Sequence, residues 1–127
     1  MISSLLQVAI GGALGASLRY LAGIGILRLV GPTAPFPLAI LTVNIVGSFL
    51  MGLFIAAAAH RGLTHLSPLV ATGILGGFTT FSAFSLEAVT LYERGAIGLA
   101  ALYVAASVVL SIGGLVLGLA LGRGAFA

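Results

Sequence analysis

Four long apolar stretches cover most of this 127-residue chain, at about 4–30, 37–59, 66–92 and 96–121. The segments between them are short and contain Pro, Gly or charged residues, which commonly end helices. Because a helix needs about 20 apolar residues to cross the hydrocarbon core of a bilayer, each stretch is long enough to span it. The continuous apolar runs exclude a membrane β-barrel, whose strands alternate. We therefore expect an all-α integral membrane protein, with one domain of four transmembrane helices over residues 1–127.

The composition excludes several classes of protein. Hydrophobic residues make up 61% of the chain and charged residues only 6%, whereas soluble domains contain about 25% charged residues. Five scattered arginines do not form the basic stripe that nucleic acid requires. With no Cys and two His, the chain also lacks the residues of a transition-metal site. We expect neither an enzyme nor a nucleic-acid-binding protein.

The arginines are nearly balanced between the two sides of the membrane. Arg61 and Arg123 fall on the side of the N-terminus, Arg28 and Arg94 fall on the other side, and Arg19 is nearer the latter. Because an excess of Lys and Arg in cytoplasmic loops sets orientation, this count predicts no strong preference. It is compatible with insertion in both orientations and pairing as an antiparallel dimer. The alternative is a single orientation, favoured by a margin that the count does not resolve.

Small residues recur at intervals of four, which lets helix backbones approach closely within a membrane. The repeats are Gly11 with Gly15, Ser48 with Gly52, and Gly114 with Gly118 and Gly122. We interpret them as helix-packing positions. They predict a tightly packed bundle. Because four short helices have little interior of their own, we expect a protein partner to complete it.

Polar side chains also lie at membrane depth, where each needs a hydrogen-bond partner. Asn44 and Ser48 share one helix face, and Tyr103, Ser107 and Ser111 form a stripe with a spacing of four. One interpretation of Asn44 is a hydrogen bond between helices; the other is a pore or binding role. A single membrane serine most often bonds the carbonyl four residues earlier, but three hydroxyls on one face also favour a polar path.

The third apolar stretch predicts a broken helix. Its Gly76-Gly77 pair and its Thr79-Thr80 pair all have poor helix propensity. An unwound backbone is tolerated at this depth only where it is buried in protein or lines a cavity, and its carbonyls can hold a cation. The alternative is an unbroken glycine-rich helix that packs closely.

Arg19 and Glu87 are the charged residues well inside apolar stretches. They could pair with each other or with another chain. Alternatively, Arg19 extends toward the interface and Glu87 lies near the end of its helix. We expect Glu93 and Arg94 to lie on a solvated face.

Three segments closely resemble the motifs of the Fluc fluoride channels, also called the CrcB family. They are GGALGASLRY at 11–20, LTVNIVGSFLMG at 41–52 and TGILGGFTTFSAFSLEA at 72–88. The hydroxyl stripe on the fourth stretch has the spacing that the family shows. The family pattern TTFSTFS differs at one position, where this chain has Ala83, and the difference concerns one hydroxyl contact along the ion path.

The resemblance implies an antiparallel, dual-topology homodimer with two fluoride pathways, which exports fluoride across a bacterial inner membrane and relieves its toxicity. It also implies a structural sodium ion at the dimer interface, held by the backbone carbonyls of Gly76 and Thr79. Arg19 matches a family arginine of vestibule or structural importance, and Glu87 matches an acidic residue near the pathway. The matching pathway residues are Asn44, Phe81, Phe84, Tyr103, Ser107 and Ser111, with Thr80 and Ser85 as further candidates.

Two other functions compete with this interpretation. A proton-coupled exporter like the small multidrug resistance family needs a carboxylate in its first helix, where this chain has Arg19 and no acid. A non-transporting membrane subunit would use its polar residues for packing alone, and it would not require a broken third helix.

Overall fold

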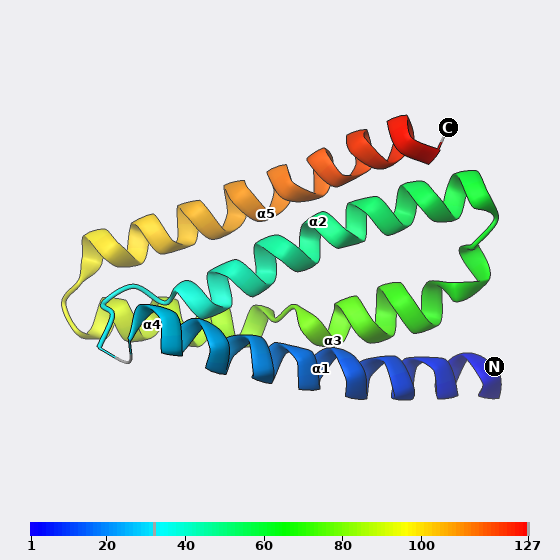
Figure 1. Cartoon of the computed structure of the whole chain (residues 1–127). Helices are drawn as coiled ribbons and strands as arrows, with labels where there is room; N and C mark the ends of the chain where they lie inside the picture. The colour runs from blue at the N-terminus through cyan, green and yellow to red at the C-terminus, as the bar shows by residue number, and fades with distance from the viewer. Residues whose placement is uncertain (32, 127) are drawn as a thin grey trace.

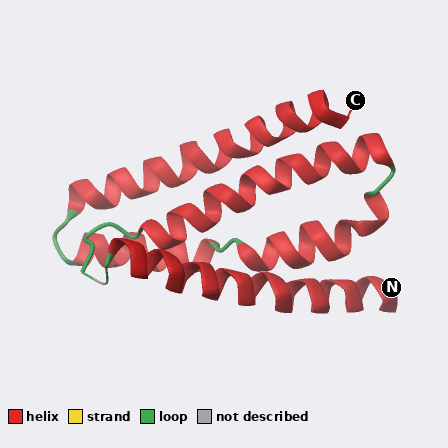
Figure 2. Ribbon diagram, in the orientation of Figure 1, coloured by secondary structure: helices red, strands yellow, loops and turns green. Residues whose placement is uncertain are grey.

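The computed structural model describes residues 1–31 and 33–126, and these are helical except for short connections (Figures 1 and 2). The long helices are α1 (Ile2–Val30), α2 (Leu38–Arg61) and α5 (Ile97–Phe126). The third span is composite. It consists of a 3₁₀ turn η1 (Thr64–Leu66), a π-helix η2 (Pro68–Leu75), a single turn α3 (Gly76–Phe78) and the helix α4 (Phe81–Glu93).

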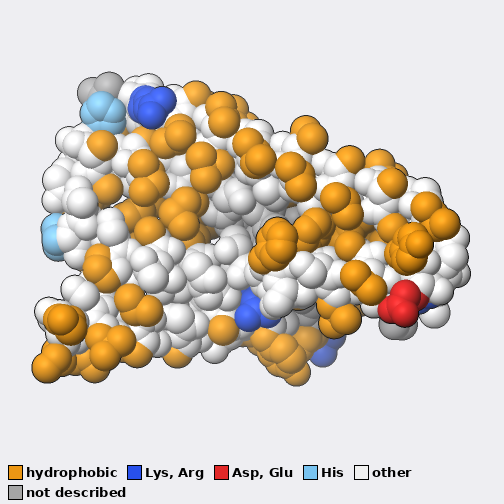
Figure 3. Space-filling view, turned by 180° about the vertical axis from the view of Figure 1, so that it is seen from behind, with side chains coloured by type: hydrophobic (Ala, Val, Ile, Leu, Met, Phe, Trp, Pro, Cys, Tyr) orange, Lys and Arg blue, Asp and Glu red, His pale blue; other side chains and the backbone are white. Residues whose placement is uncertain are grey.

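The predicted all-α architecture is confirmed: four spans are long and apolar enough to cross a membrane. Hydrophobic side chains extend along the whole length of the face in Figure 3, as lipid contact requires. The fourth span differs from the prediction, because α5 continues to Phe126 instead of ending near residue 121. No proline interrupts 122–126, and a backbone near the membrane is best satisfied by continued helical hydrogen bonds.

Both described ends of the chain lie at the same end of the bundle, as four successive crossings require (Figure 1). Sharp turns connect the spans. Gly62 and Gly95 have φ values of 67° and 83°, a backbone conformation that glycine adopts without steric cost. Gly62 caps α2 and Gly95 follows α4, so each marks the point where the chain reverses.

The repeated small residues pack helix against helix, as predicted. α1 lies against η2 and α3, and α2 lies against α5. A Cβ atom on Gly15 would lie 2.9 Å from the backbone nitrogen of Phe78, and one on Gly118 would lie 3.0 Å from that of Leu53. The backbones therefore approach too closely for a side chain at these positions. This close packing stabilises the bundle in lipid, where helix association has no hydrophobic driving force.

The π-helix is a feature that sequence analysis did not predict. The amide of Gly76 bonds to the carbonyl of Ala71, five residues earlier, and also to that of Gly73. Such wide turns are rare and often occur beside functional sites. Here the π-helix leads directly into the interruption of the third span.

We expect Gly118→Ala to lower the free energy of unfolding by about 1–3 kcal/mol, because the added methyl group forces α5 away from the backbone of α2. The matched control is Gly113→Ala on the same helix, where a Cβ atom meets nothing within 4 Å. Thermal unfolding of the purified protein in detergent measures both. Equal stability of the two variants would contradict this account of the packing.

Candidate functional site

The third span is interrupted at Thr79 and Thr80, as the sequence predicts. Both residues have extended backbones, with φ, ψ values of −85°, 159° and −152°, 127°. The side-chain amide of Asn44 on α2 pairs with this segment through two hydrogen bonds. Its Oδ1 accepts from the amide of Thr80 at 2.8 Å, and its Nδ2 donates to the carbonyl of Thr80 at 3.0 Å. Asn44 thus replaces the helical partners that Thr80 has lost.

Two redirected amides leave two carbonyls without their helical donors. In a continuous α-helix the amide of Thr80 would bond to the carbonyl of Gly76, and that of Ala83 would bond to the carbonyl of Thr79. In this structure the amide of Thr80 bonds to Asn44, and that of Ala83 bonds to Oγ1 of Thr80 at 3.1 Å. The carbonyls of Gly76 and Thr79 are therefore available to another partner.

Arg19 reaches from α1 to the same interruption. Its Nε donates to the carbonyl of Gly77 at 3.1 Å. This carbonyl belongs to the last turn before the break, where the partial negative charge of a helix terminus attracts a cation. Arg19 therefore stabilises the end of the first half of the span and places a positive charge beside the break.

A groove of about 320 Å³, which we call the hydroxyl groove, opens between α2, the break and α5. Its walls contain six of the eight predicted pathway residues: Asn44, Thr80, Phe81, Phe84, Ser107 and Ser111. Thr79 also lines it, as do three residues that were not predicted for the pathway: Ser48, Val108 and Ile112. The spacing of Ser48, one turn after Asn44, is the signal that could have identified it.

The hydroxyl stripe of α5 has hydrogen-bonding capacity that the chain does not use. The Tyr103 OH and the Oγ atoms of Ser107 and Ser111 are buried and have no hydrogen-bond partner among the described residues. In contrast, Ser17 and Ser85 bond to the carbonyls four residues earlier, at 2.6 Å and 2.9 Å. Because an unpartnered buried hydroxyl is costly, the stripe is suited to a ligand that accepts hydrogen bonds.

Four aromatic rings form a continuous series beside the groove. The Phe81 and Phe84 centroids lie 5.4 Å apart, the Phe84 and Tyr103 centroids lie 5.4 Å apart, and Phe36 meets Tyr103 edge-on at 5.6 Å. Tyr103 is fully buried, whereas Phe81 is 79% exposed. Phe36 was missed because its segment, between two prolines, was interpreted only as a helix terminator.

Two predicted pathway residues do not line the groove. Tyr103 lies in a buried cluster with Leu41, Leu91 and Ala100, and reaches the groove only through its contact with Phe84. Ser85 lies on α4, and its hydroxyl is bonded within that helix.

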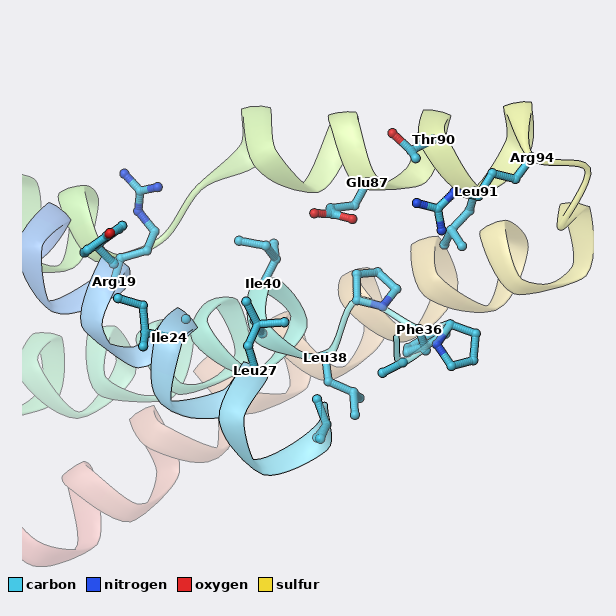
Figure 4. Close-up of a pocket in the computed structure, with 17 residues that line it drawn as sticks. Arg19, Ile24, Leu27, Phe36, Leu38, Ile40, Glu87, Thr90, Leu91 and Arg94 are labelled. Carbon is cyan, nitrogen blue, oxygen red and sulfur yellow. The ribbon is translucent and has the colours of Figure 1, made fainter. Parts of the chain in front are cut away.

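A second cavity, of about 460 Å³, lies between α1, the 34–37 segment and α4; we call it the charged cavity. Arg19, Glu87 and Arg94 all line it, and Figure 4 shows Arg19 at one end, Arg94 at the other and Glu87 between them. Within the described part of the chain, none of the three has an ion-pair partner within 4.0 Å. Arg94 is exposed, as expected of a solvated face, and it also lines this cavity. Its spacing of seven residues from Glu87, two helical turns, is the signal that places both on one face.

Comparisons with known proteins agree on one family. The family described as CrcB-like protein, Camphor Resistance (CrcB), matches residues 6–119. A protein of Ruegeria sp. named fluoride-specific ion channel FluC is 64% identical over 124 residues, which cover 98% of each chain. Proteins with the same name from Roseobacter denitrificans and Agrobacterium fabrum are 62% and 54% identical. They cover 98% and 94% of this chain, and 99% and 95% of their own lengths. These relatives are named as ion channels, which are not enzymes.

We expect Asn44→Ala to reduce stability by about 2–4 kcal/mol, because it leaves the amide and the carbonyl of Thr80 without partners in a region shielded from water. Ser48→Ala is the matched control, since Ser48 lies one turn away on the same groove wall. Thermal unfolding and hydrogen exchange at the Thr80 amide measure the difference. The role of Asn44 is refuted if both variants unfold alike.

Proposed function

We propose that this chain, which belongs to the CrcB-like family matched over residues 6–119, is a fluoride channel. The observation that carries the proposal is the buried, unpartnered hydroxyl stripe of Tyr103, Ser107 and Ser111. Fluoride accepts hydrogen bonds and donates none, so a path for the dehydrated ion must offer donors. The wall of the hydroxyl groove presents such donors, and no charged side chain of the described residues lines it. A small anion can therefore bind in the groove and still dissociate from it, as conduction requires.

The residues around the groove have complementary roles in this proposal. Ser107 and Ser111 replace water by donating hydrogen bonds to the ion. Phe81 and Phe84 present ring edges, which carry the positive part of the aromatic quadrupole and attract an anion only weakly. Asn44 keeps the break open and has one further N–H, since Nδ2 carries two and one of them bonds Thr80.

We further propose that a sodium ion is held by the backbone carbonyls of Gly76 and Thr79. The fit rests on the two redirected amides, which leave these carbonyls available, and carbonyl oxygens suit a hard cation. The ion would supply positive charge at the broken helix and would take no part in conduction.

An antiparallel homodimer completes the proposal. Phe81 is 79% exposed although it lines the groove, so part of the groove wall is open in a single chain. Gly76 has ordinary helical angles, and a Cβ atom on it would meet only the carbonyl of Ala71, at 3.4 Å. The chain itself therefore does not require glycine there, and a second copy or a shared ion at close range would. The balanced arginines agree with pairing of the two orientations.

The biological role that follows is export of fluoride across a bacterial inner membrane, which relieves its toxicity. A proton-coupled exporter is disfavoured because neither α1 nor the hydroxyl groove contains a carboxylate. A non-transporting subunit would not account for three unpartnered hydroxyls in one stripe.

Fluoride efflux from liposomes tests the function. Purified protein should release trapped fluoride, measured with a fluoride electrode, but not trapped chloride. Ser107→Ala with Ser111→Ala should slow fluoride release at least about tenfold, because a hydrogen bond to a charged group contributes about 1.5–3 kcal/mol. The control is Ser17→Ala, whose hydroxyl is bonded within α1. Release no faster than from protein-free liposomes would refute the channel.

Gly76→Ala tests the dimer interface. Within one chain the methyl group is tolerated, so helix content should be unchanged. At a close interface it should weaken dimerisation by about 1–3 kcal/mol through overpacking. Gly113→Ala, where a Cβ atom meets nothing within 4 Å in the single chain, is the control. Subunit exchange between differently labelled proteins measures the effect, and identical exchange for both variants would contradict the interface.

A further inference from the structure

Arg94 occupies the outer end of the charged cavity. It follows the last turn of α4, where its backbone amide bonds to the carbonyl of Thr90 at 3.1 Å. Its side chain is exposed, lines the cavity, and makes no hydrogen bond to the described part of the chain. The helix end therefore places this side chain at the cavity, and its guanidinium donors remain available.

The three charges follow one another along the cavity. Arg19 lies deepest, because its Nε bonds to Gly77 at the break. Glu87 follows on α4, and Arg94 is two turns further out, about 10 Å along the helix axis. Figure 4 shows the same order. The cavity thus leads from the end of the bundle toward the break that the hydroxyl groove adjoins.

The cavity carries a net positive charge. Its lining contains two arginines and one glutamate, and its other side chains are apolar apart from the hydroxyls of Tyr20 and Thr90. Thr90 donates its hydroxyl to the carbonyl of Leu86 at 2.7 Å, so that donor is already used. A net charge between walls of low polarity concentrates the field and raises the local concentration of an oppositely charged ion.

We propose that Arg94 captures fluoride at the mouth of the charged cavity and sets the rate at which the ion reaches the break. The proposal rests on the proposed function and deepens it. Arg94 raises the local anion concentration without entering the dehydrated path, whereas Arg19 spends one of its donors on Gly77. Glu87, between the two arginines, lowers the positive potential of the cavity and so limits capture of the anion.

The test compares Arg94→Gln with Arg28→Gln in proteoliposomes at low fluoride concentration. Arg28 is a matched control because it lies at the same end of the bundle and is exposed, but does not line the cavity. At about 0.01 M ionic strength Arg94→Gln should slow fluoride release about two- to three-fold. This is the effect expected for removing a unit charge about 10 Å from the ion in water. At about 0.5 M inert salt the difference should vanish, because charges are screened within a few ångströms. Arg28→Gln should match the unmodified protein at both.

Two further variants separate capture from structure. Arg94→Lys keeps the charge and should restore the rate, while Glu87→Gln should raise release at low ionic strength. Arg94→Gln that conducts like the unmodified protein at low salt overturns the proposal, as does an equal loss at both salt concentrations, which would indicate a structural role. The unmodified protein is tested in parallel. If the chain is not a fluoride channel, the unmodified protein itself releases no fluoride; if only the role of Arg94 is wrong, the unmodified protein still releases it.

Discussion

The pairing of the Asn44 side chain with the backbone of Thr80 is the interaction on which the rest of the site depends. A membrane interior offers no water to satisfy an interrupted helix, so an extended segment survives there only if another part of the chain supplies its partners. Asn44 supplies an acceptor and a donor together, at 2.8 Å and 3.0 Å. The Thr80 hydroxyl then starts the next helix by accepting from Ala83. This local exchange of hydrogen bonds makes the carbonyls of Gly76 and Thr79 available.

Close packing at glycine places Asn44 within hydrogen-bonding distance of Thr80. Gly47, one turn after Asn44, is buried, and a Cβ atom on it would overlap the methyl group of Thr79. α2 can therefore approach the break closely only because glycine stands at that position. On its opposite side, α2 packs on α5 through Gly52 and Gly118 with similar closeness, which places the hydroxyl stripe across the groove from the break. Helix packing and polar chemistry are thus two results of one set of short interhelical distances.

Charge and hydrogen-bonding capacity are kept apart in this bundle. The hydroxyl groove contains neutral donors and aromatic rings, whereas Arg19, Glu87 and Arg94 line a separate cavity, in which Arg19 alone reaches the break. Such a division suits an anion that must be attracted over a distance and then held weakly. A guanidinium inside the groove would bind the ion strongly enough to slow its departure, and hydroxyls at the mouth would not draw it from solution.

Much of this arrangement follows from the sequence alone. Four apolar stretches predict the spans, because only helices satisfy their own backbone in lipid, and the Gly-Gly and Thr-Thr pairs predict the broken helix. The four-residue repeats predict which faces pack, and the motifs indicate the family. Only the tertiary structure shows that Asn44 is the partner of Thr80, that the hydroxyls of Ser107 and Ser111 do not bond their own helix, and that Arg94 shares a cavity with Arg19. The reason is physical: a periodicity determines which face of a helix a residue occupies, but a hydrogen bond or a cavity depends on distances between helices remote in sequence, which only the packed bundle sets.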